Sequence, residues 1–170
     1  MKKTILVGLI AFFVFRPLFA QDFLQQWRDS AIKSMNEFRA AQADTIKAGG
    51  WQFVDGLTNA EGVPLADVFI KDVKVQDGAV RSAQVLSAFY APASSADVPE
   101  YQSSKAVVWF DCSGGSLEQR GIERYSSKDG AGPATSSEAL KPATAPREMR
   151  TAEPQTIDKT LLAAVCTAKL

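Results

Sequence analysis

The stretch DVFIKDVKVQDGAVRSAQVLSAFY, residues 67–90, decides the fold of this chain. Its two halves, 67–75 and 80–90, alternate apolar and polar residues with a period of two, which is typical of β-strands. Between them, Asp77-Gly78 is a strong hairpin signal, because both central positions of such a turn must tolerate positive φ. We therefore predict an antiparallel hairpin, around which consecutive strands form a meander.

Three other segments extend this sheet in the prediction: 51–57, 105–112 and 118–126. The segment 91–99 between two of the strands contains two prolines and small residues, so we predict a loop there. Residues 127–156 are rich in Ala, Ser, Thr, Gly and Pro, which favours a loop or tether. A sixth, edge-type strand could lie around residues 134–140.

Helical periodicity appears at both ends of the mature chain. Apolar residues of the N-terminal helix recur at spacings of three and four until Gly49-Gly50: Leu24, Trp27, Ala31, Met35, Phe38 and Ala41. This stripe should pack on the sheet for most of its length, or on a partner. A second, short helix is predicted over 157–168. The fold class is therefore α+β: an antiparallel sheet of about six strands with a long N-terminal helix, a short C-terminal helix and one disulfide.

The first twenty residues have the pattern of a cleavable export signal. Lys2 and Lys3 precede an apolar run of about 12 residues, and the small residue Ala20 follows it. The run is too short to span a bilayer, which needs about 20 residues. We predict a signal peptide over 1–20, an amphipathic helix over 21–50 and one domain over 51–170. No membrane anchor is expected after cleavage.

Export places the only two cysteines, Cys112 and Cys166, in an oxidising compartment. With two cysteines, only one intramolecular bridge can form. We therefore predict a structural disulfide that pins the C-terminal segment to the end of the strand 105–112.

Composition argues against several classes of function. The chain has no histidine, which removes the common catalytic triads and the histidine general base. It offers no metal-binding or cofactor-binding motif, so we predict neither a metal nor a cofactor. The mature chain carries 16 basic and 19 acidic residues, a balance that argues against nucleic acid as a partner. We expect a protein that is not an enzyme.

Aromatic residues on the strands offer candidates for partner binding. Most aromatic side chains in a sheet fill its core. Tyr90 and Tyr101 flank the segment with the two prolines, so we expect these two to be the most exposed and to be candidate partner contacts. The helix residues Leu24, Trp27, Met35 and Phe38 are a candidate surface for a homodimer.

Several short motifs resemble the surface-adhesin protein E family over roughly residues 51–168. They are Tyr101-Gln102-Ser103-Ser104-Lys105, Asp111-Cys112, Arg120, Tyr125-Ser126, Gly130-Ala131-Gly132 and the terminal Val165-Cys166. Upstream, Trp51 and the hairpin around Gly78 are similar to the opening hairpin of that family.

The resemblance implies a six-stranded antiparallel sheet with a helix beside it and bridged cysteines. It also implies a bacterial envelope protein that acts as an adhesin-like module, binds extracellular-matrix or serum proteins of a host and can dimerise. The named adhesin is a lipoprotein, whereas this chain has no cysteine directly after its predicted cleavage site. Two locations therefore stay open, the cell surface and the periplasm, and with them a periplasmic structural or accessory role without host contact.

Overall fold

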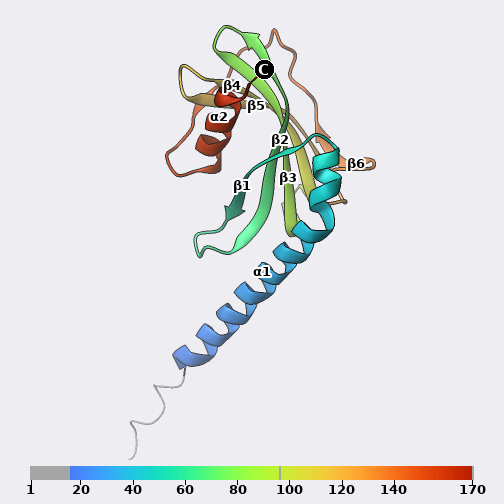
Figure 1. Cartoon of the computed structure of the whole chain (residues 1–170), viewed down its shortest axis with the longest axis vertical. Helices are drawn as coiled ribbons and strands as arrows, with labels where there is room; N and C mark the ends of the chain where they lie inside the picture. The colour runs from blue at the N-terminus through green and yellow to red at the C-terminus, as the bar shows by residue number, and fades with distance from the viewer. Residues whose placement is uncertain (1–15, 96, 170) are drawn as a thin grey trace, which may run out of the picture.

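A computed structural model describes residues 16–95 and 97–169 (Figure 1). Most of the predicted signal peptide, residues 1–15, lies outside the described residues. The order of elements is one helix, seven strands and a second helix. The strands are β1 (Gln52–Thr58), β2 (Pro64–Asp77), β3 (Val80–Ser95), β4 (Val98–Asp111), β5 (Ser116–Tyr125), β6 (Ala134–Glu138) and β7 (Arg150–Thr151), and the helices are α1 (Arg16–Ala48) and α2 (Ile157–Thr167).

All strand pairs are antiparallel, and the order across the sheet is β1-β2-β3-β4-β5-β6, with β7 paired to β5. The hairpin between β2 and β3 turns at Gly78, whose φ is +52°. The antiparallel sheet, the predicted edge strand β6 and the short C-terminal helix are confirmed. The two-residue β7, which pairs with Ser116 and Leu117 of β5, was not predicted.

The predicted loop over 91–99 is wrong, because β3 runs on to Ser95 and β4 begins at Val98. Pairing between these strands is irregular from Ala88 to Ala93. Pro92 lies in that irregular part, where its missing N–H breaks no regular ladder. Strand structure therefore accommodates a proline that, in the sequence alone, indicates a loop.

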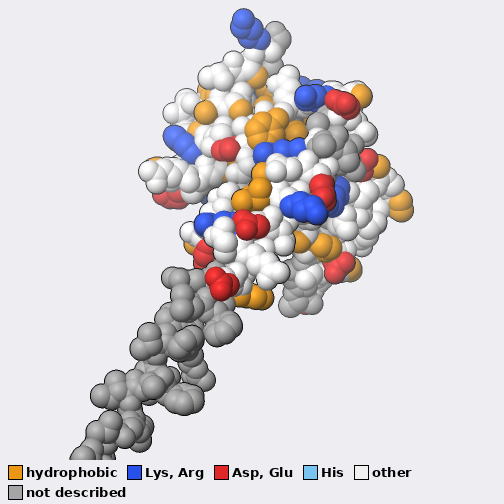
Figure 2. All heavy atoms as spheres, turned by 60° about the horizontal axis from the view of Figure 1, so that its bottom comes forward, with side chains coloured by type: hydrophobic (Ala, Val, Ile, Leu, Met, Phe, Trp, Pro, Cys, Tyr) orange, Lys and Arg blue, Asp and Glu red, His pale blue; other side chains and the backbone are white. Residues whose placement is uncertain are grey.

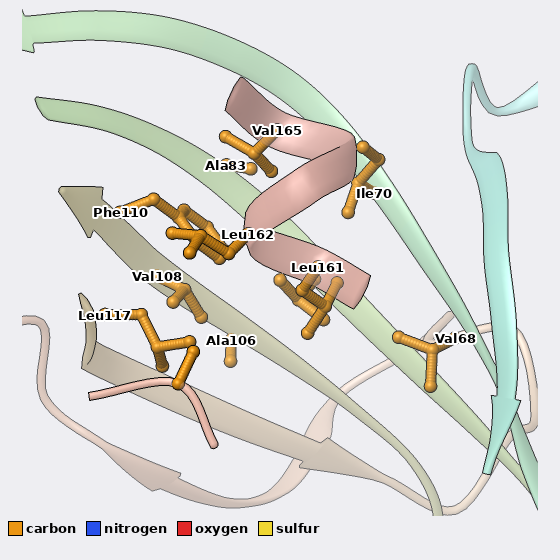
Figure 3. Close-up of a cluster of buried hydrophobic side chains, with 12 residues drawn as sticks. Val68, Ile70, Ala83, Ala106, Val108, Phe110, Leu117, Leu161, Leu162 and Val165 are labelled. Carbon is orange, nitrogen blue, oxygen red and sulfur yellow. The ribbon is translucent and has the colours of Figure 1, made fainter. Parts of the chain in front are cut away.

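The sheet has two apolar faces, each partly covered by one helix. On the α2 face, side chains of β2, β3, β4 and β5 pack against Leu161, Leu162 and Val165 of α2, as Figure 3 shows. On the opposite α1 face, Ile46 at the end of α1 joins a smaller cluster: Trp51, Phe69, Leu86, Ala88 and Tyr90. Strand alternation sends neighbouring residues into these two separate clusters.

The predicted disulfide is confirmed. Cys112 lies one residue after β4, Cys166 lies in the last turn of α2, and their Cα atoms are 5.6 Å apart. The bridge joins residues 54 positions apart and attaches α2 to its face of the sheet.

Among the side chains that the structure describes, those of α1 that contact the sheet lie in its C-terminal half, so the expectation of packing over most of its length is wrong. Met35 and Ile46 join the cluster on the α1 face, and Arg39 pairs with Asp67 of β2. Towards its N-terminus the helix projects away from the sheet (Figure 1). Trp27 there is 48 % exposed. None of the described helices has the length and apolarity to cross a membrane.

Candidate functional site

The α2 face is only partly covered, because α2 has eleven residues and the strands beneath it are longer. Beyond the N-terminal end of α2 the same face continues with five side chains of β3, β4 and β5, and we name this surface the open face: the half-buried Ser87, Phe89, Tyr101 and Arg124 and the buried Ser104. The register supports this placement for four of them, since Val68 pairs with Ser87, Ala66 with Phe89 and Ser104 with Arg124. Tyr101 follows an irregular part of the pairing and is placed by its contacts with Phe89 and Arg124.

Two aromatic rings and a guanidinium group form the centre of the open face. The rings of Phe89 and Tyr101 lie edge to face, with centroids 5.5 Å apart. The guanidinium carbon of Arg124 lies 5.7 Å from the centroid of the Tyr101 ring. Arg124 Nη2 also donates to Glu138 Oε1 of β6 at 2.8 Å. These contacts hold the three side chains in place, and Tyr and Arg are the residue types most enriched at energetic centres of protein interfaces.

A hollow of about 150 Å³ lies between this surface and the first turns of α2. Its walls are mainly apolar and include Leu57, Val85, Ala106 and Leu161. Polar groups line the hollow as well. They are the hydroxyls of Ser87 and Ser104, which belong to the open face, and the ion pair between Arg150 and Asp158. Such a mixture suits the apolar side chain of a partner, with polar groups at the rim to fix its direction.

Tyr101 therefore lies where a partner could reach it, half-buried within the open face. Tyr90 does not lie where a partner could reach it, and the expectation that it is exposed is wrong. Its side chain is 7 % exposed and packs in the cluster on the α1 face. Burial, and next the nearby Asp67 carboxylate, raise the pKa of Tyr90 above its ordinary value. Tyr90 is buried because the end of α1 covers this part of the sheet. Arg39 of this helix donates from Nη2 to Asp67 Oδ1 at 2.6 Å. A partner contact by either tyrosine stays a prediction.

The motif residues around β4 and β5 act as a structural lock. Ser103 Oγ donates to the carbonyl of Ser127 at 2.6 Å, and Lys105 Nζ donates to the carbonyl of Gly130 at 2.7 Å. The ammonium of Lys105 also lies 5.0 Å from the centroid of the Tyr125 ring. Gly130 has a φ of +70°, and a Cβ there would lie 2.4 Å from Lys105 Cε. These residues fix the connection between β5 and β6 and are not available as a binding surface.

A buried arginine holds the segment 139–149, which we name the strap. Arg120 is 1 % exposed and unpaired in the register of β5 with β4, so its side chain is free to reach the strap. It donates to the strap carbonyls of Pro142 and Pro146 and to Glu118 Oε2 at 3.0 Å. Its guanidinium carbon lies 4.7 Å from the centroid of the Trp109 ring.

The carboxylate of Glu118 completes this buried group, with Lys141 Nζ of the strap 3.2 Å away. Burial raises the pKa of Glu118, but the hydrogen bonds from Arg120 and Lys141 outweigh it, and the net pKa lies below the ordinary value. Glu118 is therefore ionised at neutral pH. The charge of Arg120 is compensated inside the protein, which indicates a structural role for this pair.

Sequence reasoning missed Phe89 and Arg124 as members of the open face. Their signal was present in the alternation of β3 and β5, but alternation does not say which part of a face a helix leaves uncovered. In the ranges 16–95 and 97–169, no group of three or more His, Cys, Asp or Glu side chains could hold a metal ion. On the side of the molecule shown in Figure 2, basic and acidic side chains are interspersed, with small apolar groups between them.

Comparison with known proteins gives one match. Residues 58–167 match the family described as Surface-adhesin protein E. Searches of the curated proteins and of the solved structures each found no match. The matched range holds β2 to β7, all of α2, both cysteines and the structural lock, so the match covers most of the sheet with its bridged helix. The chain belongs to the surface-adhesin protein E family.

Proposed function

We propose that this protein is an exported bacterial adhesin-like module, which binds a protein partner through the open face and catalyses no reaction. The partner class that fits is a host extracellular-matrix or serum protein. The observation that carries the proposal is the group of Phe89, Tyr101 and Arg124 beside an apolar hollow.

The family supports this proposal at a coarse level, because it implies an adhesin-like protein of the cell surface. The physical chemistry of the open face supports it at the level of residues. Its three central side chains are pre-ordered by contacts with one another, so binding would cost little additional conformational entropy. The predicted signal peptide provides the route out of the cytoplasm.

Location at the cell surface is the part of the proposal to test first. Intact cells that express the native protein are treated with a protease, beside a lysed control, and the protein is followed by immunoblot. The proposal expects loss of the protein from intact cells. Survival in intact cells with digestion after lysis would place the protein in the periplasm and would favour the structural or accessory role without host contact.

A control protein of known periplasmic location should survive in the same intact cells, which verifies that the outer membrane stayed closed. The Cys112→Ala/Cys166→Ala variant, expressed in parallel, checks that resistance to the protease does not come from the folded domain alone. Digestion of both proteins in the lysate and of neither in intact cells would contradict surface display.

A further inference from the structure

Among the described residues, the outer edge of the sheet at β6 is unpaired. β6 is the last strand in the order of the sheet, and among the described residues no other strand pairs with its outer edge. Four of its five residues are exposed, and its side chains are short apart from Glu138. From Ser136 to Glu138 its register with β5 is regular, so alternate backbone N–H and C=O groups point outward there.

The other edge of the sheet, at β1, is different. Its register with β2 shifts between Phe53 and Asp55, which interrupts a regular ladder. The N–H of Gly56 is taken by the carboxylate of Asp55 at 2.8 Å. The Phe53 ring lies under Arg39 of α1, whose guanidinium carbon is 5.8 Å from the ring centroid. These are devices by which proteins prevent an edge strand from pairing with another chain, and β6 lacks them from Ser136 to Glu138.

We propose that β6 is a strand-addition site, at which an extended segment of the protein partner pairs with Ser136 to Glu138 and extends the sheet. This inference rests on the proposed function and names how the partner is held. The occupant is a polypeptide strand because the unpaired groups of the edge are backbone donors and acceptors, and these complement another backbone.

The position of β6 next to the open face gives the added strand its specificity. Glu138 of β6 pairs with Arg124, so an added strand would lie one strand spacing, about 5 Å, beyond this ion pair. Alternate side chains of the added strand would point to the open face. The others would point to the α1 face, where a hollow of about 300 Å³ is lined by Gly121, Ser137 and the 61 % exposed Leu140.

A pair of proline variants tests the proposal. Consecutive residues of a strand point their N–H groups to opposite edges, so Ser136→Pro and Ser137→Pro differ in effect. One removes a hydrogen bond to β5 and should lower the melting temperature. The other removes only an outward N–H and should melt like wild type. Ser136→Ala and Ser137→Ala are the matched controls, which remove the hydroxyls and keep the N–H groups.

Binding of the full mature protein to a panel of purified fibronectin, laminin and collagen is then measured by surface plasmon resonance. We expect the proline variant with the wild-type melting temperature to bind at least tenfold more weakly, and both alanine variants to bind like wild type. Equal binding by wild type and that proline variant would overturn strand addition and leave the proposed function intact. Absence of binding by wild type would overturn both.

Two further measurements check whether the strand that pairs with β6 belongs to the partner. On binding, hydrogen exchange should slow at residues 136–138 and stay unchanged at 55–57 of β1, which serves as the internal control. Sedimentation without any partner should give the same mass for wild type and the proline variants. A dimer of wild type that the edge proline dissociates would make the occupant a second copy and overturn the assignment to a partner.

Discussion

Arg120 is the residue on which the strap depends most. Its side chain is fully buried, and it satisfies Glu118 and two strap carbonyls at once. Arg120→Met should lower the free energy of unfolding by about 3 kcal/mol, because it leaves a buried carboxylate with only Lys141 as its cation. Urea denaturation of the oxidised protein measures this loss.

Arg147→Met is the matched control for Arg120. Arg147 lies over the same Trp109 ring at 5.5 Å and pairs with Asp77, but its side chain is 40 % exposed. Its removal should cost at most about 1 kcal/mol, as is usual for exposed ion pairs and cation–π contacts. Equal effects of the two substitutions would contradict a special role for burial at Arg120.

The raised pKa of Tyr125 predicts that the folded protein loses stability at alkaline pH. Burial and the hydrogen bond to Glu123 raise the pKa of Tyr125 to about 12. A tyrosine in the unfolded chain has a pKa of about 10, so stability from this group is present below pH 10 and is lost as pH rises towards 12. The loss is on the order of 2 to 3 kcal/mol for a two-unit difference.

The measurement is urea denaturation of wild type and Tyr125→Phe at pH 9 and at pH 11.5. Phenylalanine keeps the ring and removes the proton, so the variant should lose less stability between these two values. Tyr90 adds to the loss in the same direction in both proteins, because its pKa is also raised. Identical losses in wild type and variant would contradict the assignment to Tyr125.

At the scale of residues, the sequence predicts strand positions better than it predicts exposure. Tyr101 lies on the open face and Tyr90 is buried, although both flank the same segment with two prolines. The difference arises because the end of α1 covers the α1 face at Tyr90. The local sequence pattern does not show where a distant helix will cover the sheet. Arg120 shows a second limit, because simple alternation puts it on the face of Ile122. The unpaired register position shifts it to the other face, against Trp109.

At the scale of elements, the disulfide joins the apolar side chains of α2 in attaching the helix to the sheet. The helix is short, and isolated helices of this length are marginal in water. Cys112→Ala/Cys166→Ala should lower the free energy of unfolding by about 4 kcal/mol, since the bridge closes a loop of more than fifty residues. Thermal and urea unfolding in oxidising buffer measure this loss.

Wild type in reducing buffer is the control for the disulfide variant, and the two should unfold alike. The double substitution also avoids a leftover thiol that could join two molecules. A variant that unfolds at the same urea concentration as oxidised wild type would show that Leu161, Leu162 and Val165 hold α2 without help.

The strands were predictable where alternation and turn residues agree, as in the hairpin at Gly78. The strap and β7 were not, because their sequence is rich in Ala, Pro and Thr and has no period. Their order comes from distant residues: Arg120 for the strap and Ser116 with Leu117 for β7. For α1 the apolar stripe correctly indicated a helix. Its stripe did not show that, among the side chains described there, Met35 and Ile46 join the core while Trp27 stays exposed.

At the scale of the whole molecule, two helices cover two faces of one sheet unevenly. The disulfide fixes α2 at one end of its face, and Arg39 with Ile46 fixes the end of α1 on the other. The remainder of the α2 face is not covered by the helix and lies beside the unpaired edge of β6. A polypeptide partner that used both would contact side chains and backbone in one continuous area, which suits an adhesin-like module.

Family resemblance could be read from the motifs, and the fold followed from it together with the strand pattern. The candidate site could not be read from them, since the motif residues Ser103, Lys105, Tyr125 and Gly130 fix the connection between β5 and β6, and the open face consists of other residues. The homodimer expected from the helix stripe stays a prediction. Trp27 is exposed as that expectation requires, whereas Met35 packs against the sheet.

The measurement that tests the central claim most directly is binding of the oxidised mature protein to purified fibronectin, laminin and collagen, compared with Tyr101→Ala. Phe53→Ala is the matched control, because Phe53 is also an aromatic residue with an edge-to-face neighbour but lies on the α1 face and is 54 % exposed. We predict at least tenfold weaker binding for Tyr101→Ala, which corresponds to the loss of one central interface residue, and wild-type binding for Phe53→Ala. Wild-type binding by a folded Tyr101→Ala variant would contradict the assignment of the open face as the binding surface.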